Sequence, residues 1–500
     1  MNKKKSLFLL LTIPALILGA CSKGQKSDSS NVEPSSSSVA QSTTSEAPSS
    51  SNPQSSSAPS SSSQQSSSSS SAPSPSPIKI SVELGAFLKE GSYELEFDYN
   101  DSYFLTNPEE YNEDLSLLSF GAAISTGSVE DLQSFFGAAN FNDIACYGYD
   151  IAPTEDTIGY SFAHKVISGY DLVAVTARGF NYGMEWANNF LIGEEGNHQG
   201  FYARAQEVYA SLSTYVNAKC NTGKLKLWLT GYSRGGAIAN VLSDIIVRRT
   251  DITVWQDSFY AYTFEAPAGL NNDDLGDYAF VHNIVNANDV VANVPPASYG
   301  LGRCGVDYPI YDENVSSIVK AFDEEAVISE FVETEIDGVT YKNDTELVAH
   351  LLDHIFNNQS EGVSEYTANN RTEYVNRYQT GIGHAFGYIF ALSSETRQSI
   401  MDDLSSDVWT AMSALSSGEN LALFLETYLD RDNISYVHED LVADCETAIN
   451  AIFNLFNEVL AMYLNEEYKP NLNRLISFHY PETVYALLLN AHNKVTTIME

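Results

Sequence analysis

The sequence is poor in basic residues and in cysteine, and it has no long hydrophobic run. Only 26 Lys and Arg stand against 65 Asp and Glu in 500 residues, which gives a formal net charge of −39. Phosphate binding needs clustered positive charge, so this balance argues against nucleic acid as a partner and against attraction to anionic lipid surfaces. Hydrophobic residues nevertheless make up 43% of the chain. That fraction is enough for a packed core and excludes a chain that is disordered throughout.

Residues 1–20 have the pattern of a secretory signal peptide. Three lysines near the start precede an apolar stretch over 7–18. This stretch is too short to span a bilayer, and no other apolar run reaches about 18 residues. It ends in Leu-Gly-Ala-Cys21, which resembles the bacterial lipobox and implies cleavage before Cys21 and lipidation of its thiol. The alternative is an ordinary signal peptide followed by a chance cysteine.

Residues 21–77 are dominated by serine, with proline, glutamine and alanine between the serines. Such a composition cannot bury enough apolar surface to offset the entropy lost on ordering. We therefore expect a disordered tether that holds the following domain away from a lipid anchor. Together with the signal, it predicts an exported protein attached to the extracytoplasmic face of the cell membrane.

Four further cysteines lie in the rest of the chain. An exported protein can form disulfides, and four cysteines allow three pairings, but buried free thiols are equally compatible with the sequence. Their wide spacing matches no zinc motif. The four are Cys146, Cys220, Cys304 and Cys445.

Short apolar runs alternate with helical patterns from residue 78 onward. Two segments with apolar residues at three- and four-residue spacing, 201–218 and 237–247, predict helices. The alternation predicts an α/β fold with a mostly parallel sheet flanked by helices. Residues 82–99 alternate in polarity and predict antiparallel edge strands. The runs that predict the parallel strands are 171–177, 225–230, 259–264 and 280–285.

A Gly-x-Ser-x-Gly motif, Gly231-Tyr-Ser233-Arg-Gly235, follows the predicted strand 225–230 and precedes a helix that we expect to start near Gly236. Glycines at these positions allow a turn too tight for side chains, which lifts the serine hydroxyl above the sheet edge. This strand–helix context favours a nucleophile elbow over an ordinary glycine-rich turn. Ser233 is therefore the predicted nucleophile.

Several blocks in order around this motif resemble the class 3 lipase family, the α/β-hydrolase branch that contains secreted fungal triacylglycerol lipases. The resemblance runs from about residue 160 to 305 and fades on both sides. The blocks are Val175-Thr-Ala-Arg178-Gly179-Phe180 with Trp186 downstream, His198-Gln-Gly200-Phe201, the Ser233 motif, Thr263-Phe-Glu-Ala-Pro267 and Asn286-Ala-Asn-Asp289-Val-Val-Ala-Asn-Val-Pro295-Pro296. The fourth is similar to a Thr-Phe-Gly-Ala-Pro block of the family.

The resemblance and the order of the predicted strands assign roles to the site residues. Phe180, Ser233 and Asp289 each follow a predicted parallel strand, and ligands of open α/β sheets bind at those carboxyl ends. Asp289 would orient the catalytic base, although a loop-capping aspartate is the alternative. The backbone N–H groups of Phe180 and Arg234 would bind the oxyanion. The family often has Ser or Thr where Phe180 stands, so a side-chain contribution to the oxyanion is absent here.

The base is the least determined residue of the predicted site. The order Ser, Asp, His of this fold leaves His350, His354, His384, His438, His479 and His492. We favour His479, which lies between the Asn/Pro-rich stretch 469–473 and a new helix, although Pro481 and Glu482 depart from the fungal pattern. The His350/His354 pair and His384 remain alternatives. His350-x-x-x-His354 lacks the glutamate of a zinc motif, and His164, His198 and His282 precede Asp289 and are interpreted as structural.

The chain is thus divided into residues 1–20, 21–77, a hydrolase core at 78–305, a helical insertion at 306–470 and a return to the core at 471–500. Helical periodicity is visible at 318–332, 346–356, 382–392 and 448–463. The insertion is either a cap over the active site or a scaffold extension. Residues 183–197 lie where the related lipases keep their lid, and they either shield the site or pack on the sheet.

The sequence predicts a lipid-anchored serine esterase or lipase that cleaves carboxylic esters through an acyl-enzyme on Ser233, without metal or organic cofactor. The substrate remains open among triacylglycerols, phospholipids, short-chain esters and acylated polysaccharides, since the motif does not fix the pocket. Acyl transfer or amide cleavage by the same elbow is one alternative. A non-catalytic surface binding module on the same fold is another.

Overall fold

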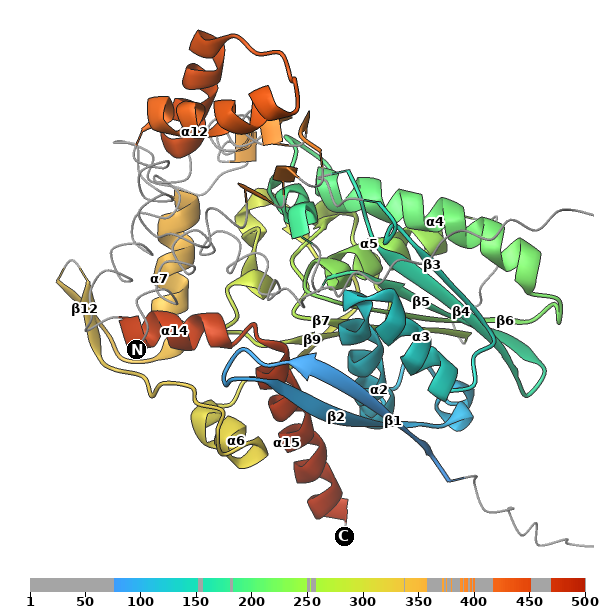
Figure 1. The fold of residues 1–500 in the computed structure, drawn as a ribbon. Coiled ribbons are helices and arrows are strands. Elements are labelled where there is room, and N and C mark those ends of the chain that lie inside the picture. Colours follow the sequence, from blue (N-terminus) through green and yellow to red (C-terminus); the bar gives the residue numbers. More distant parts are fainter. Residues whose placement is uncertain are drawn as a thin grey trace, which may run out of the picture. The chain divides into compact units, whose positions relative to one another are not determined.

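A seven-stranded sheet forms the centre of the computed structural model (Figure 1). Its strand order is β11-β9-β7-β6-β5-β4-β3, with β5, β6, β7, β9 and β11 parallel and β3 and β4 antiparallel at one edge. The strands are β3 (Asp143–Tyr147), β4 (Tyr160–Ile167), β5 (Tyr170–Ala177), β6 (Leu225–Tyr232), β7 (Phe259–Phe264), β9 (Val281–Val285) and β11 (Val306–Pro309). This is the predicted α/β-hydrolase type of fold.

The structure describes residues 76–151, 156–179, 183–249, 252, 258–336, 338–357, 417–450 and 469–499, and several short stretches between 371 and 400. The predicted signal peptide, Cys21 and nearly all of the tether lie outside the described residues. None of the described helices has both the length and the apolar character that a membrane crossing requires.

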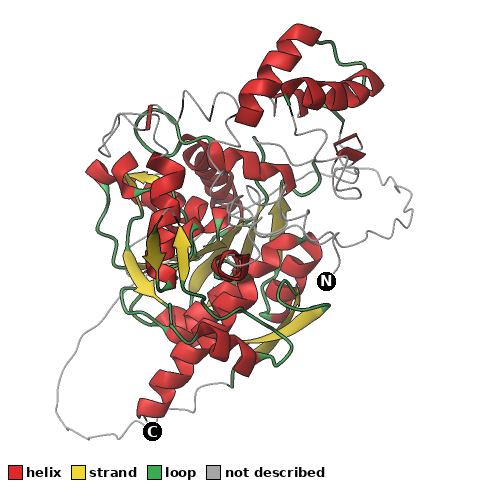
Figure 2. Cartoon of the chain, turned by 90° about the vertical axis from the view of Figure 1, so that its left-hand side faces the viewer, coloured by secondary structure: helices red, strands yellow, loops and turns green. Residues whose placement is uncertain are grey.

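Helices cover both faces of the central sheet, and the side chains of each strand alternate between the two layers. Trp228 and Tyr232 of β6 pack with α2 and α3, whereas Leu227 and Leu229 pack with α4 and α5. Figure 2 shows the strands between helices. The helices are α2 (Glu113–Ile124), α3 (Val129–Ala138), α4 (Gln199–Lys219) and α5 (Arg234–Arg248).

The register brings the carboxyl ends of the central strands to one level. Ala177 of β5 is opposite Gly231 of β6, and Gly231 is opposite Thr263 of β7. Segments that follow these strands therefore meet at a common edge, as parallel connections require. The predicted strands at 171–177, 225–230, 259–264 and 280–285 and the predicted helices at 201–218 and 237–247 are all confirmed.

The prediction of edge strands at 82–99 was only partly right. β1 (Ile78–Gly85) and β2 (Ser92–Tyr99) do pair antiparallel, but they form a two-stranded sheet of their own. Their inward residues, such as Leu84 and Phe97, belong to the same buried cluster as α2 and α3. The antiparallel edge of the main sheet is made by β3 and β4 instead.

The segment after residue 305 begins with an edge strand of the central sheet, because β11 pairs with β9. The helix predicted at 318–332 is wrong beyond its first part, since α6 (Val315–Phe322) ends at Phe322 and residues 323–333 are not helical. The helix predicted at 346–356 is present as α7 (Asp344–Asn357). Those at 382–392 and 448–463 lie largely outside the described residues. This part also contains β12 (Thr334–Ile336), β13 (Val339–Tyr341) and α12 (Gly418–Arg431).

Two helices bring the C-terminus back to the core. The Asn/Pro-rich stretch 469–473 lies in α14 (Lys469–Ser477). After a short turn that contains His479, the predicted new helix, α15 (Pro481–Met499), begins at a proline, which is suited to the first helical position. α15 packs against α2 and α6. Short elements complete the fold: η1 (Asp101–Leu105), η2 (Ser125–Gly127), η3 (Gly183–Phe190), η5 (Asn272–Asp274), η6 (Val291–Asn293), η7 (Ala297–Tyr299), and β8 (Leu270–Asn271) paired with β10 (Leu301–Gly302).

The four cysteines after the tether are all free. Burial raises the pKa of each thiol, to about 11 for Cys146 and to about 12 for Cys220 and Cys445. Cys304 is fully buried beside Asn240 of α5. Of the two possibilities that the sequence left open, the structure therefore has free thiols rather than bridges.

Candidate active site

Ser233 is the single residue that connects β6 to α5, and its backbone conformation is strained. Its φ of 54° and ψ of −127° lie in a region that residues with a side chain rarely adopt. The backbone N–H of Ser233 donates to the carbonyl of Phe264 at 2.8 Å. A β-carbon on Gly179 or Gly235 would overlap neighbouring backbone atoms, those of Tyr232 and Ala177 respectively. The glycines therefore let the end of β5 press against this turn, and the turn projects the serine above the sheet.

Ser233, His479 and Asp289 form a continuous chain of hydrogen bonds. His479 Nε2 lies 2.9 Å from Ser233 Oγ, and His479 Nδ1 lies 2.5 Å from Asp289 Oδ2. The residues are 246 and 190 positions apart in the sequence, and each side chain is at most 2% exposed. Asp289 Oδ1 also accepts the backbone N–H of Val291 at 2.9 Å. This is the geometry by which a histidine removes a serine proton while an aspartate orients the ring.

The loop that carries His479 is held from two sides. The Tyr232 hydroxyl donates to the carbonyl of His479, and the two rings stack at 5.3 Å. Glu482, in the first turn of α15, accepts the backbone N–H groups of Phe87 and Leu88 at 2.6 and 2.8 Å. The segment after β1 thus fixes the start of α15. Glu482 departs from the fungal pattern, and that departure was the sequence signal for this contact.

A buried cluster of charges lies beside the nucleophile. Glu185 of η3 is fully buried and forms two ion pairs. One is with Arg178, which directly follows β5, and the other is with Arg234, the first residue of α5, at 3.0 Å. One carboxylate thereby joins the loop after β5 to the nucleophile turn. Sequence reasoning missed Glu185, although an isolated acid in the mostly apolar run 183–192 was a signal.

A second missed carboxyl group contacts Asp289. Glu265 follows β7 with a φ of 46°, at the position where the resembled motif has glycine, and its side chain is fully buried. Both of its carboxyl oxygens accept the backbone N–H of Asn286, at 3.1 and 3.0 Å. Burial and the neighbouring Asp289 raise the pKa of Glu265 well above its ordinary value.

Of the described side chains, His479 is the histidine that reaches both Ser233 and Asp289. The His350 ring packs on Tyr341 with centroids 4.7 Å apart. His438 bonds to Glu426 at 2.6 Å and His492 to Glu113 at 3.1 Å. The side chain of His354 and the whole of His384 lie outside the described residues.

The three earlier histidines form hydrogen bonds with groups other than Ser233 and Asp289, and the bond of His164 is to Asp171. His198 caps α4 by accepting the N–H of Phe201 at 3.3 Å, and its burial lowers its pKa to about 3. His282 bonds to the carbonyl of Pro108 at 2.8 Å, and burial lowers its pKa as well.

The predicted oxyanion donors are described only in part. Phe180 and the side chain of Trp186 lie outside the described residues. Arg234 is the first residue of α5. Its backbone N–H lies at the positive end of the helix dipole. An anion beside Ser233 Oγ would be stabilised there.

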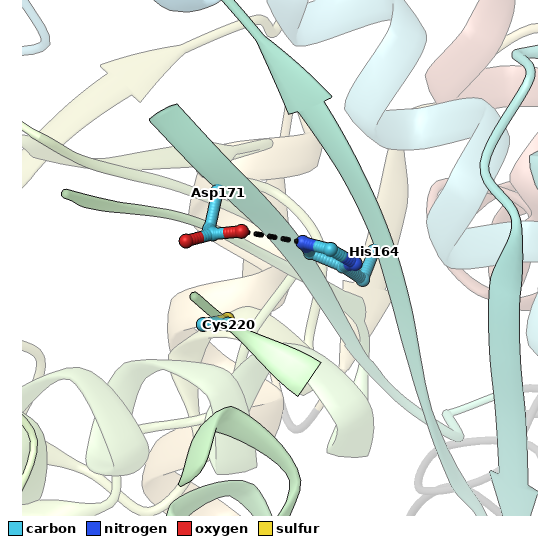
Figure 3. A group of neighbouring side chains, drawn as sticks. All are labelled: His164, Asp171 and Cys220. Atoms are coloured by element: carbon cyan, nitrogen blue, oxygen red, sulfur yellow. Dashed lines mark hydrogen bonds and ion pairs between the residues drawn. The ribbon is translucent and has the colours of Figure 1, made fainter. Parts of the chain in front are cut away.

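One group in the described part of the chain brings metal-ligating atoms close together: His164, Asp171 and Cys220 (Figure 3). Asp171 Oδ1 lies 2.9 Å from His164 Nε2, and Oδ2 accepts two backbone N–H groups and the Thr222 hydroxyl at 2.6–3.0 Å. Burial acts to raise the pKa of Asp171, but the bonds from Thr222 and His164 lower it. Because hydrogen bonds already satisfy the carboxylate, we assign this group a structural role.

Residues 167–299 match the model of the family described as lipase (class 3). A comparison with curated proteins gave no match. Among solved structures, a triacylglyceride lipase from Rhizomucor miehei shares 17% identity over 40% of this chain and 80% of that chain, with a TM-score of 0.30. A mono- and diacylglycerol lipase from Aspergillus oryzae shares 13% identity over 41% and 81%, with a TM-score of 0.32. A lipase from Rhizopus microsporus var. chinensis shares 17% over 40% and 75%, with a TM-score of 0.30.

Proposed function

We propose that this carboxylic ester hydrolase, whose residues 167–299 match the class 3 lipases, cleaves fatty acyl esters of lipids through an acyl-enzyme on Ser233. The observation that carries the proposal is the hydrogen-bonded chain from Ser233 through His479 to Asp289 at a strand–helix turn. The fatty acyl preference rests on the family match, since the described residues do not define an acyl pocket.

The reaction follows from the positions of the donors and acceptors. His479 Nε2 takes the Ser233 proton as Oγ attacks the ester carbonyl, and Asp289 stabilises the imidazolium through Nδ1–H. The N–H of Arg234, together with that predicted for Phe180, binds the oxyanion. His479 then protonates the leaving alcohol. A water molecule, activated by the same histidine, attacks the acyl carbon and releases the fatty acid.

Substrate access in this proposal requires a movement, because Ser233 is only 2% exposed. The predicted lid, residues 183–197, is held by Arg371 of the insertion. The Arg371 guanidinium donates to the carbonyls of Gly193 at 2.7 Å, Ile192 at 2.9 Å and Gly196 at 3.0 Å, and to that of Tyr299 at 3.4 Å. These contacts support an insertion that acts as a cap rather than as a distant scaffold extension.

Hydrolysis of p-nitrophenyl esters from acetate to palmitate by residues 76–500 tests the proposal. We expect activity that rises with chain length and is lost in both Ser233→Ala and His479→Ala, with Ser211→Ala as a control serine outside the site. If hydrolysis is lost in Ser233→Ala but retained in His479→Ala, His479 is not the base, and His350, His354 and His384 become the candidates. No hydrolysis and no labelling of Ser233 by a fluorophosphonate would favour the non-catalytic binding module.

We also propose export and a lipid anchor on Cys21, on the pattern of residues 1–21 alone. Cells that express the full chain and are fed radiolabelled palmitate should label the protein, and Cys21→Ser should abolish the label. Labelling that persists in Cys21→Ser would contradict the anchor and would leave the hydrolase proposal untouched.

A further inference from the structure

We propose that Glu265 is a positioning residue of this site, a protonated carboxyl group that donates a hydrogen bond to the carboxylate of Asp289. The chain of groups would then run from Glu265 through Asp289 and His479 to Ser233. The inference rests on the proposed function of the Ser233 site, because a positioning residue has a kinetic role only if Ser233 is the nucleophile. The protonation of Glu265 is a separate physical statement that can be measured without a substrate.

The contact between the two carboxyl groups is enclosed. Glu265 is 0% and Asp289 1% exposed. The backbone of Asn286 joins the two residues: its N–H donates to both carboxyl oxygens of Glu265, and its carbonyl accepts the N–H of Asp289 at 2.9 Å. If both of these neighbouring carboxyl groups were ionised, they would repel each other strongly, because burial keeps away the water that would otherwise screen their charges. The pair therefore retains one proton between them, as other buried carboxyl pairs do.

The neighbouring donors indicate which carboxyl group keeps the proton. Asp289 accepts one hydrogen bond on each oxygen, from the N–H of Val291 and from His479 Nδ1. Glu265 receives a single N–H, that of Asn286, shared between its two oxygens. Since hydrogen-bond donors favour the ionised form, Asp289 is the carboxylate and Glu265 is the acid. The raised pKa of Glu265 agrees with this arrangement.

One nearby cation must be considered. The charge of Arg303, which follows β10, acts to lower the pKa of Glu265. Its guanidinium, however, donates to the carbonyls of Ala266 and Ala292 at 2.9 and 2.6 Å and pairs with Asp307 at 2.9 Å. Arg303 is therefore already partly neutralised. The charged groups that face Glu265 are thus Asp289, Arg303 and, through Asp289, the ring of His479.

The backbone provides an independent argument. Glu265 has a φ of 46°, in the left-handed region where a β-carbon is unfavourable. The resembled motif has glycine at this position, which would adopt the same φ without strain. A strained residue with a fully buried acid is expected where the side chain contributes something that glycine cannot supply. Here that contribution is a proton donor beneath Asp289.

Two substitutions separate a neutral Glu265 from an ionised one. Glu265→Gln can accept from Asn286 and donate to Asp289, so we expect kcat/KM within about twofold of wild type and an unchanged acidic limb of its pH profile. Glu265→Met has a similar size but no donor. Loss of a hydrogen bond to a charged group costs about tenfold in kcat/KM, and the acidic limb should move to higher pH because Asp289 then holds the imidazolium more strongly. A shift to lower pH in both variants would overturn the proposal, since it means that an ionised Glu265 was removed.

Infrared spectroscopy tests the proton without any enzymatic activity. At neutral pH the wild-type spectrum minus that of Glu265→Gln should show the C=O band of a buried carboxylic acid. Glutamate labelled with carbon-13 should shift the same band in the wild type, so the result does not depend on folding of the variant. Carboxylate bands in place of the acid band would overturn the proposal even in an active hydrolase. An acid band in a protein that cleaves no ester would sustain the protonation and refute the proposed function alone.

Thermal unfolding gives a further check on the same proton. An acid whose pKa is raised on folding takes up a proton when the chain folds, so its contribution to stability falls as the pH rises above its ordinary value. Glu265→Gln needs no such proton. Its Tm should therefore exceed that of the wild type at pH 8, and the difference should shrink toward pH 5. A difference that stays constant with pH would contradict the proposal.

Discussion

Two buried His–Asp pairs in the described part of the chain differ in what surrounds them. His479 bonds to Asp289 beyond the carboxyl ends of the strands, whereas His164 of β4 bonds to Asp171 near the start of β5 (Figure 3). The second nitrogen of His479 faces Ser233 at 2.9 Å, whereas that of His164 faces Asp143 at 3.6 Å. The same two side chains thus form a candidate base in one place and a structural link in the other.

The comparison shows that the surroundings of the aspartate decide its role. Asp171 accepts three hydrogen bonds from residues 221–222, and it thereby holds the loop that connects α4 to β6. Asp289 has one backbone donor, the imidazole and a second carboxyl group, Glu265. A pairing of His with Asp is therefore a weak indicator of catalysis by itself. What distinguishes the His479–Asp289 pair is that the second ring nitrogen of His479 faces Ser233, a serine held in a strained backbone conformation.

The largest effect should separate the two aspartates in kinetics. We expect Asp289→Asn to lower kcat/KM by about 10⁴-fold, because the amide favours the wrong tautomer of His479. Asp171→Asn should leave kcat/KM of the folded protein within about twofold. Initial rates on a p-nitrophenyl ester, corrected for the active fraction, measure both. Wild-type rates in Asp289→Asn would remove Asp289 from the site and make the two pairs equivalent.

A second test concerns the charges that join the nucleophile turn to η3. Glu185→Gln leaves the buried guanidinium groups of Arg178 and Arg234 without their carboxylate, which should lower the free energy of unfolding by about 3–5 kcal/mol. Urea denaturation measures the loss. Glu194→Gln, at an exposed position of the same segment, is the control. If both variants unfold at the same urea concentration, the cluster does not contribute to stability.

Asp171→Asn should have a smaller effect, and on stability rather than on rate. Its carboxylate accepts two backbone N–H groups, a hydroxyl and His164, and an amide can satisfy only part of that set. We expect a loss of about 1–3 kcal/mol in the free energy of unfolding. The exposed Asp273→Asn serves as the reference in the same denaturation series. A loss of activity larger than the loss of folded protein would indicate that this pair does contribute to catalysis.

The smallest effect should appear in the pH dependence of stability. The folded state lowers the pKa of Asp171, so its contribution is present above the ordinary aspartate value of about 3.9 and is lost as the pH falls through the folded value. The Tm difference between wild type and Asp171→Asn should therefore be full at pH 6 and vanish in strong acid. This is the opposite of the trend expected for Glu265. A difference that persists in strong acid would show that the charge of Asp171 is not what stabilises the loop.

The parallel strands and the helices between them were predictable because apolar side chains dominate them. β4 was missed since His164 and Lys165 interrupt its apolar pattern, although both are buried through their bonds to Asp171 and Asp101. α14 was not predicted, because Pro470 and two asparagines are more typical of loops than of helices. A proline in the first turn loses no helical hydrogen bond, and Asn471 bonds to the backbone of Val332.

The site was predictable to different degrees for each residue. Ser233 and Asp289 stand in local motifs after strands, and the structure places them together with His479. The chain distance of 190 residues between Asp289 and His479 carries no geometric information, so the sequence left several histidines open. Glu185 and Glu265 were missed because their contacts depend on the tertiary fold and follow no local sequence motif. Glu265 nevertheless gave one sequence signal, because it replaces the glycine of the Thr-Phe-Gly-Ala-Pro block that residues 263–267 resemble.

The contacts of Glu482 with Phe87 and Leu88 have a consequence for biogenesis. Protein synthesis proceeds from the N-terminus, so Ser233 is synthesised long before His479, its proposed base. An unfinished chain therefore holds Ser233 without a partner to remove its proton. Under the proposed function, the site becomes reactive only when α15 closes onto the segment between β1 and β2.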